Sequence, residues 1–172
     1  MSTMNQLGKY QPYPDYKYSG VEWLGDVPNN WTVGSFRHAV DDIKNGSTET
    51  QVDEAENTVP ISRIESISKG EIDFGRVGYI QKKPSLCQFK LNIGDILLSH
   101  INSLSMIGNV AQLTTNTTLY HGMNLLRLKP SAKMNKRFLL WWLKSDLSRK
   151  TIESLAKPAI NQAREGANKS LI

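Results

Sequence analysis

The chain has 172 residues, a net charge of +5 and a sequence pI of about 9.3, with 39% hydrophobic and 22% charged residues. These values are typical of one folded domain and argue against a disordered chain. The sequence contains no apolar run near the roughly 18 residues of a membrane span, no signal-peptide layout, and only Cys87 as a thiol, which excludes an internal disulfide. We therefore expect a cytoplasmic protein without a membrane partner.

Charge is unevenly distributed along the chain. The segment 41–56 contains six acidic residues and only Lys44 as a base, whereas 129–150 contains seven basic residues and only Asp146 as an acid. A run of like charges is often a solvated face, but a basic stripe also attracts nucleic-acid phosphates. Both interpretations stay open at this point.

The first half of the chain is expected to contain short elements. Residues 1–18 are polar and predict an N-terminal arm, followed by one domain over 19–172. Residues 31–36 predict a short strand, and 36–43 predict a helical turn that ends at Asn45-Gly46. Residues 51–57 read as an exposed loop.

Apolar runs separated by turn residues predict four further strands. "TVPISRI" at 58–64 contains Pro60, which favours an edge strand or a bulge, and 68–75 is typical of a turn. "GDILLSHI" at 94–101 predicts a buried strand after a glycine turn. Two more strands are expected in 107–114 and 123–130, where Pro130 ends the second.

The apolar period changes after Pro130. The stretch 135–156 predicts two helices, and Phe138, Trp141 and Trp142 share one face of the first, with Leu139 and Leu143 beside it. We expect these aromatic residues to pack in the core, together with Leu147, Ile152, Leu155 and Ala156 of the second helix. Strands followed by helices predict an α+β fold with a mixed or antiparallel twisted sheet and C-terminal helices.

Catalytic and metal-binding motifs are not found. The sequence has no glycine-rich phosphate loop, and its three histidines, His38, His100 and His121, lack metal-ligand spacing. Residues 73–75 read "DFG", but no other kinase element accompanies them. Asp42 and Lys44 match the end of a metal-dependent nuclease motif, so a nuclease is one rival hypothesis. We otherwise expect no metal, no cofactor and no enzymatic activity.

Several segments resemble a known family. "YKYSGVEWLGDVPNNW" at 16–31 resembles the opening of specificity subunits of type I restriction-modification systems. The resemblance continues through "DDIKNGST" at 41–48, "TVPISRIESISKGEID" at 58–73, "LNIGDILLSHINSLSMIGNVAQL" at 91–113 and "NKRFLLWWLKS" at 135–145. It covers nearly the whole chain after Tyr16.

The resemblance implies a single target-recognition domain with a fold like that of the DNA-methylase specificity domains. Such a domain reads one half of a bipartite site on double-stranded DNA and is not catalytic. Methylation and cleavage belong to modification (methyltransferase) and restriction subunits, which use S-adenosylmethionine and ATP. The long spacer helices of the family are missing from this sequence, which puts two-site recognition and subunit docking in doubt. A decoy or interaction module for restriction subunits is therefore a second rival hypothesis.

Two sets of residues follow from this interpretation. Trp23, Leu24 and Trp31 are expected to be structural anchors that pin the N-terminal segment to the domain. DNA contacts are expected from polar loop residues, since phosphate clamps and base readers are side chains of these types. These candidates are Lys44, Asn45, Ser47, Thr48, Arg63, Ser66, Lys69, His100, Asn102, Ser103, Ser105, Asn161, Gln162, Arg164 and Lys169. The acidic residues 53–56 are expected to point away from DNA.

Overall fold

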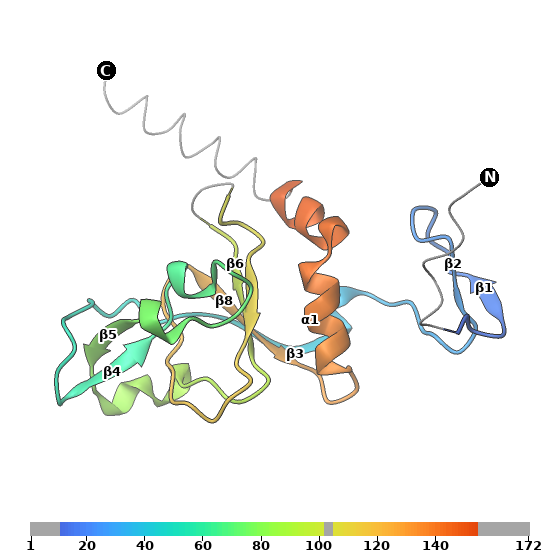
Figure 1. Ribbon diagram of the computed structural model, residues 1–172. Helices are drawn as coiled ribbons and strands as arrows, with labels where there is room; N and C mark the ends of the chain where they lie inside the picture. Colours follow the sequence, from blue (N-terminus) through green and yellow to red (C-terminus); the bar gives the residue numbers. More distant parts are fainter. Residues whose placement is uncertain (1–10, 102–104, 155–172) are drawn as a thin grey trace, which may run out of the picture. The chain divides into compact units, whose positions relative to one another are not determined.

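The computed structural model describes residues 11–101 and 105–154 and divides the chain into two compact units, Met1–Ser35 and Phe36–Ile172 (Figure 1). The predicted boundary after residue 18 stays a prediction. The first unit contains strands β1 (Tyr16–Tyr18) and β2 (Asp26–Pro28), which pair antiparallel. Gly20 and Gly25 adopt positive φ angles of 78° and 63° in the turn between them, a backbone conformation that favours glycine.

The tryptophans of the first unit are not buried. Trp23 is 63% exposed and Trp31 is 39% exposed, and the Trp31 ring meets the edge of Tyr13 at a centroid distance of 6.0 Å. The anchoring role of these residues therefore stays a prediction. The predicted strand over 31–36 is wrong, because residues 31–35 have no regular structure and no described strand pairs with them.

The second unit is built on a four-stranded sheet. Its order is β3 (Val40–Asn45), β8 (Leu125–Pro130), β6 (Ile96–Ser99) and β7 (Val110–Gln112), and every neighbouring pair is antiparallel. The predicted helical turn over 36–43 is correct only for the short 3-10 helix η1 (Phe36–His38). The segment then becomes strand β3, because it pairs antiparallel with the apolar strand β8, with an irregularity in the register between Val40 and Asp42.

A hairpin of β4 (Thr58–Ile61) and β5 (Gly78–Gln81) forms a separate two-stranded sheet. Both of its strands are edges, which explains how Pro60 is accommodated within β4 as predicted. Three short 3-10 helices surround it: η2 (Glu65–Ile67), η3 (Phe74–Arg76) and η4 (Pro84–Phe89). The strands of all three sheets are antiparallel, and parallel pairing occurs in two isolated bridges, Ser47 with Gly122 and Ile61 with Tyr120.

Strand β6 of the four-stranded sheet is buried on both faces. Ile96 and Leu98 contribute to a core shared with helix α1 (Lys136–Lys144), whereas Leu97 contributes to a second core with Ile64 and Ile67. Figure 1 shows α1 alongside the sheet. Burial on both faces explains why "ILLS" is a continuous apolar run rather than an alternating one. The coarse α+β prediction, a sheet with C-terminal helices, agrees with this architecture.

Helix α1 packs with a different face from the predicted one. Asn135 caps it by accepting the backbone N–H groups of Arg137 and Phe138, each at 3.0 Å. Leu139 and Leu143 are the buried residues, each 2% exposed, while Phe138, Trp141 and Trp142 are 42%, 60% and 36% exposed. The prediction of an aromatic core is therefore wrong, because the helix turns its leucines to the sheet. Trp142 instead stacks on the ring of Phe36 at 5.6 Å.

A second helical segment occupies residues 146–154. Ile152 packs against the same core as α1, as predicted, but Leu147 is exposed. The other two expected core residues, Leu155 and Ala156, lie outside the described residues. Within the described part of the chain, no helix has the length and apolar character needed to cross a membrane.

The two faces of α1 predict different costs of truncation. Leu143→Ala removes a buried side chain and should lower the free energy of unfolding by about 2–5 kcal/mol. Trp141→Ala removes an exposed ring that Arg137 covers at 4.8 Å, and should cost at most about 1 kcal/mol. Denaturant unfolding of both variants measures this difference, and a larger loss for Trp141→Ala would show that the aromatic face is the packed one.

Candidate nucleic-acid interface

Loops from distant parts of the sequence leave the four-stranded sheet at one end of its strands, which we call the sheet edge. In the register of the sheet, Asn45 at the end of β3 pairs with Leu126, and Ser99 at the end of β6 pairs with Leu125. The ends of β3 and β6 therefore lie beside the start of β8. As a result, residues 46–48, the loop after Ser99 and the segment 121–124 all start from this edge. The predicted loop 44–48 begins later than expected, because Lys44 and Asn45 pair with β8 as the last residues of β3.

Three backbone segments touch at this edge, at Gly46, Gly122 and Ser62, which we call the glycine junction. The Ser47 N–H donates to the His121 carbonyl at 2.8 Å, and the Met123 N–H donates to the Ser47 carbonyl at 3.0 Å. The Gly122 N–H donates to the Ser62 hydroxyl oxygen at 3.0 Å. These bonds join the end of β3, the segment before β8 and the segment after β4.

Only glycine fits at two of the three positions. A Cβ atom on Gly46 would overlap the carbonyl of Gly122, and a Cβ atom on Gly122 would overlap the carbonyl oxygen of Ser62. Because both obstacles are backbone atoms, no side-chain rotation relieves them. The glycine of "KNGST" is therefore needed for close packing of three segments.

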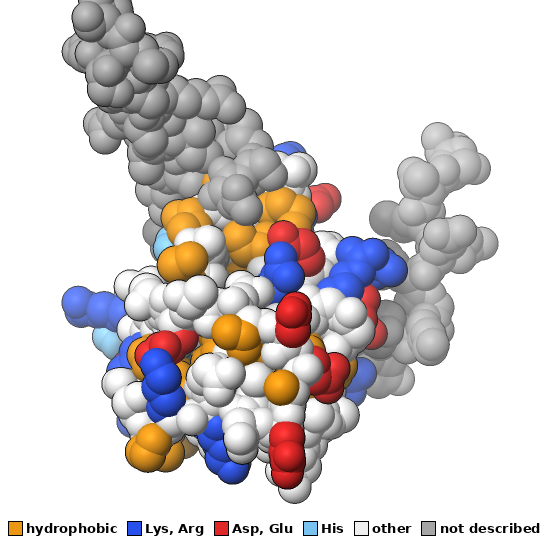
Figure 2. Space-filling model, turned by 90° about the vertical axis from the view of Figure 1, so that its left-hand side faces the viewer, with side chains coloured by type: hydrophobic (Ala, Val, Ile, Leu, Met, Phe, Trp, Pro, Cys, Tyr) orange, Lys and Arg blue, Asp and Glu red, His pale blue; other side chains and the backbone are white. Residues whose placement is uncertain are grey.

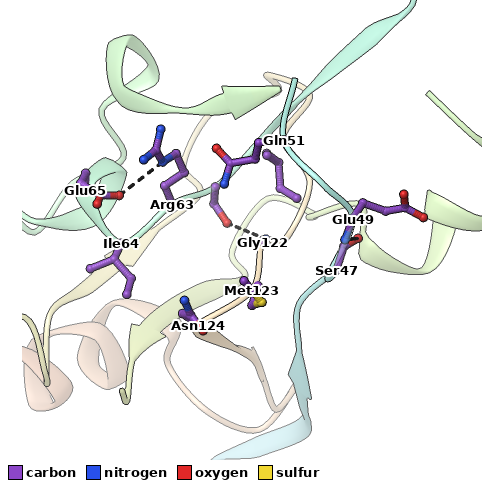
Figure 3. A pocket seen from close by; sticks show the side chains of 11 residues that line it. Ser47, Glu49, Gln51, Arg63, Ile64, Glu65, Gly122, Met123 and Asn124 are labelled. Carbon is purple, nitrogen blue, oxygen red and sulfur yellow. Dashed lines mark hydrogen bonds and ion pairs between the residues drawn. The ribbon is translucent and has the colours of Figure 1, made fainter. Parts of the chain in front are cut away.

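A polar hollow of about 150 Å³ lies at this junction, lined by residues of 47–51, 61–65 and 122–124 (Figure 3). The guanidinium of Arg63 forms an ion pair with Glu65, with 3.4 Å between Nε and Oε2. Lys83 Nζ lies 2.7 Å from a carboxylate oxygen of Glu49, which also lines the hollow. The structure thus places Arg63 and part of the predicted loop 44–48 around one space.

The predicted contact residues divide by exposure. Lys44, Asn45, Thr48, Arg63 and Lys69 are exposed. Ser47 and Ser66 are buried, and their hydroxyls bond within their own loops.

The two serines shape the backbone of their loops. Ser47 Oγ accepts the Glu49 N–H at 3.2 Å, and Ser66 Oγ donates to the Arg63 carbonyl at 2.7 Å. In this conformation, neither serine side chain is available for its predicted contact with DNA.

The second group of predicted contacts is only partly described. Ser105 is exposed, and its carbonyl accepts a hydrogen bond from Arg149 Nη2 at 3.2 Å. His100 is half-buried at the end of β6. The remaining candidates lie outside the described residues: Asn102, Ser103, Asn161, Gln162, Arg164 and Lys169.

His121 is fully buried next to the glycine junction. Its Nε2 lies 3.0 Å from the Leu125 carbonyl oxygen, and its Nδ1 has no hydrogen-bond partner among the described residues. Burial lowers the pKa of His121 to about 4, opposed by the bond to Leu125 and assisted by the charges of Arg127 and His100. Burial also lowers the pKa of His100. Both imidazoles are therefore neutral near pH 7.

Acidic and basic side chains are interspersed around the sheet. The Asp42 carboxylate lies 3.4 Å from Lys44 and 3.6 Å from Arg127, which also donates to the Gln88 carbonyl at 3.1 Å. Figure 2, which views the molecule from the left of Figure 1, likewise shows blue and red side chains mixed on one face. We find no continuous basic stripe on this face.

The nuclease hypothesis finds no support in this arrangement. Asp42 is held between two cations, Lys44 and Arg127, rather than beside other carboxylates. Within residues 11–101 and 105–154, no three His, Cys, Asp or Glu side chains gather as they would to hold a metal ion.

Of the residues that line the hollow, sequence reasoning named only Ser47 and Arg63, and the polar residues it missed include Gln51 and Asn124. Gln51 lies within the acidic segment 41–56, whose charge gives no sign of a contact with DNA. Asn124 has a φ angle of 71°, a conformation in which asparagine is enriched, but its sequence neighbours give no sign of this.

Comparison with known proteins confirms the resemblance seen in the sequence. No family model matches the chain. Over 157 aligned residues, which cover 89% of the chain, it is 36% identical to part of a type I restriction enzyme specificity subunit. That relative is a protein of Methanocaldococcus jannaschii named as the specificity subunit of the enzyme MjaX. The match covers 36% of it, so the chain spans about a third of the relative's length.

The close contact at the glycine junction predicts a strong effect of one added methyl group. Gly122→Ala forces a Cβ atom against the Ser62 carbonyl and should lower the free energy of unfolding by about 1–3 kcal/mol or more. Gly75→Ala is the control in the same unit, because its nearest neighbour is the movable Asp73 carboxylate at 3.3 Å. Denaturant unfolding tests both, and equal losses would contradict the junction.

The buried imidazole predicts stability that falls with acidification. The folded-state pKa of His121, about 4, is below the ordinary value of 6.5, so the unfolded chain binds the extra proton first. The contribution of the neutral His121 imidazole to stability is fully present above pH 6.5. The free energy of unfolding should decline by up to about 3 kcal/mol as the pH falls to 4.

Unfolding of the wild type and of His121→Gln over this pH range measures that contribution. The variant should show a flatter profile, whereas His38→Gln, at an exposed position, serves as the control. A wild-type profile no steeper than that of His121→Gln would exclude the neutral buried imidazole as its cause.

Proposed function

We propose that the chain is a sequence-specific DNA-binding domain, the target-recognition domain of a type I restriction-modification specificity subunit. The observation that carries this proposal is the 36% identity to a restriction specificity subunit over 89% of the chain. A specificity subunit selects the DNA target, so the matching domain is expected to contact DNA. We further propose that the fold of Phe36–Ile172 is that of the DNA-methylase specificity domains.

In this proposal the domain reads one half of a bipartite site on double-stranded DNA. It binds DNA without catalysing a reaction and needs no cofactor of its own. Methylation and cleavage would be performed by modification and restriction subunits associated with it. The chain matches about a third of the relative, which is consistent with one recognition domain of a longer subunit.

The sheet edge at the glycine junction is the proposed DNA-binding surface. Lys44 supplies exposed positive charge there, and Asn45, Thr48 and Arg63 supply exposed hydrogen-bonding groups. Loops held by a rigid sheet are suited to recognition, since the sheet fixes their register. Contacts from the candidates outside the described residues remain part of the proposal.

A protein-interaction module is the second candidate function. The observation that favours it is the exposed aromatic face of α1, with Phe138, Trp141 and Trp142 each at least 36% exposed. Exposed apolar patches often mark sites of protein association. Such a module would bind restriction subunits without reading DNA, so a DNA-binding measurement distinguishes the two.

The proposal predicts weak, salt-sensitive binding of duplex DNA by the full chain. One half-site offers few phosphate contacts, so we expect a Kd on the order of micromolar at low salt that weakens steeply toward physiological salt. Fluorescence anisotropy with a labelled pool of random duplexes measures this dependence. Absence of binding at low ionic strength would contradict direct DNA recognition by the chain.

Charge-removing variants locate the binding surface. Lys44→Met, at the proposed surface, should weaken binding and reduce the slope of log K against log salt by about 0.9, the value of one phosphate contact. Lys133→Met is the matched control, because Lys133 is exposed beyond Pro130, at the opposite end of β8. Equal effects of both substitutions would point to diffuse attraction instead of a defined surface.

A further inference from the structure

Two long polar side chains converge at the hollow beside the glycine junction. Gln51 comes from the loop after β3 and Arg63 from the segment after β4, and Figure 3 shows the Gln51 side chain next to that of Arg63. Both side chains lie over Gly78, the first residue of β5. A Cβ atom on Gly78 would overlap the amide oxygen of Gln51 and would lie 3.2 Å from Cδ of Arg63.

The absence of a side chain at Gly78 thus provides the space in which this pair lies. Gly78 does not have a positive φ angle, so its backbone conformation alone does not require glycine. The obstacle to a larger residue is the pair itself. We therefore regard Gly78 as the floor on which Gln51 and Arg63 are positioned.

Both side chains keep hydrogen-bonding capacity for a ligand. The ion pair with Glu65 engages Nε of Arg63, and the two terminal nitrogens have no hydrogen-bond or ion-pair partner among the described residues. The Gln51 side-chain amide likewise has no hydrogen bond within the described part of the chain. Arg63 is 44% exposed and Gln51 is exposed, so a partner outside the protein can reach both.

The charges around the hollow favour base edges over phosphates. The hollow contains the carboxylates of Glu49 and Glu65, and each is paired with one cation, Lys83 and Arg63 respectively. The two pairs sum to no net charge, so they do not attract a phosphate as an unpaired lysine does. Carboxylates do accept hydrogen bonds from base amino groups, and a carboxylate also holds a guanidinium in a fixed orientation.

We propose that Gln51 and Arg63 are specificity-determining residues that read purine edges in the major groove, Gln51 at adenine and Arg63 at guanine. These are the bases whose edges match a carboxamide and a guanidinium. Because both side chains lie over Gly78, they contact neighbouring base pairs. The inference rests on the proposed function of DNA target recognition and assigns part of the specificity to this hollow.

The test is selection of bound sequences from a random duplex pool by the full chain and its variants, followed by binding measurements on the selected duplex and its single-base changes. Gln51→Leu and Arg63→Met remove the polar groups and retain an apolar side chain at each position. Gly78→Ala displaces both groups without removing either. Gln81→Leu is the matched control, since Gln81 is exposed on the same strand β5 but does not line the hollow.

We expect the wild type to select a defined sequence, and Gln51→Leu and Arg63→Met each to lose preference at one position. Discrimination there should fall by about 5- to 150-fold, the effect of one bidentate contact. The affected positions should be adjacent, Gly78→Ala should weaken both, and Gln81→Leu should select the wild-type sequence. Unfolding midpoints near that of the wild type establish that the exposed substitutions leave the fold intact. Each of these two variants tests the contact of its own residue independently of the other.

Two outcomes would overturn the inference, and they are distinguishable. If the wild type selects a sequence and the variants select the same one, with an affinity loss that is uniform across duplexes, the pair contacts phosphate or supports the loops, while the proposed function stands. If the wild type binds no duplex at low salt, the proposed function fails and the inference fails with it.

Discussion

The backbone contact among Gly46, Gly122 and Ser62 is the constraint on which the arrangement of the candidate interface depends. It joins the end of β3, the segment before β8 and the segment after β4, and hydrogen bonds from Ser47, Met123 and Gly122 fix the three segments. Because a methyl group at Gly46 or Gly122 would overlap backbone atoms, the spacing of the three segments is set by direct contact between their main chains. The side chains of the surrounding loops are therefore positioned by the sheet itself.

This constraint separates two kinds of polar residue at the sheet edge. Ser47, Ser66 and His121 are buried and use their polar atoms to shape the loops, whereas Gln51 and Arg63 are exposed around the hollow. A recognition surface needs both kinds, because a flexible loop would lose the register on which base reading depends. The interspersed ion pairs Arg63–Glu65 and Lys83–Glu49 limit nonspecific attraction of phosphates at this edge.

Sequence reasoning predicted the elements with strong local signals. "GDILLS" contains the buried strand β6, 123–130 contains β8 and ends at Pro130, and a helix follows Asn135, because apolar runs and prolines act locally. The orientation of α1 was not predictable, since Leu139 and Leu143 compete with a larger aromatic face and tertiary packing decides. The hollow was not predictable either: Gln51, Arg63 and Gly78 are brought together by long-range pairing, which leaves no periodic pattern in the sequence.

The central claim is that the loops at the glycine junction contact DNA. Amide hydrogen exchange of the full chain, with and without saturating duplex at low salt, tests it most directly because it reports on each segment separately. The account predicts that duplex slows exchange in 44–51, 61–65 and 122–124 while exchange in α1 is unchanged. Protection confined to α1, with these three segments unaffected, would contradict it.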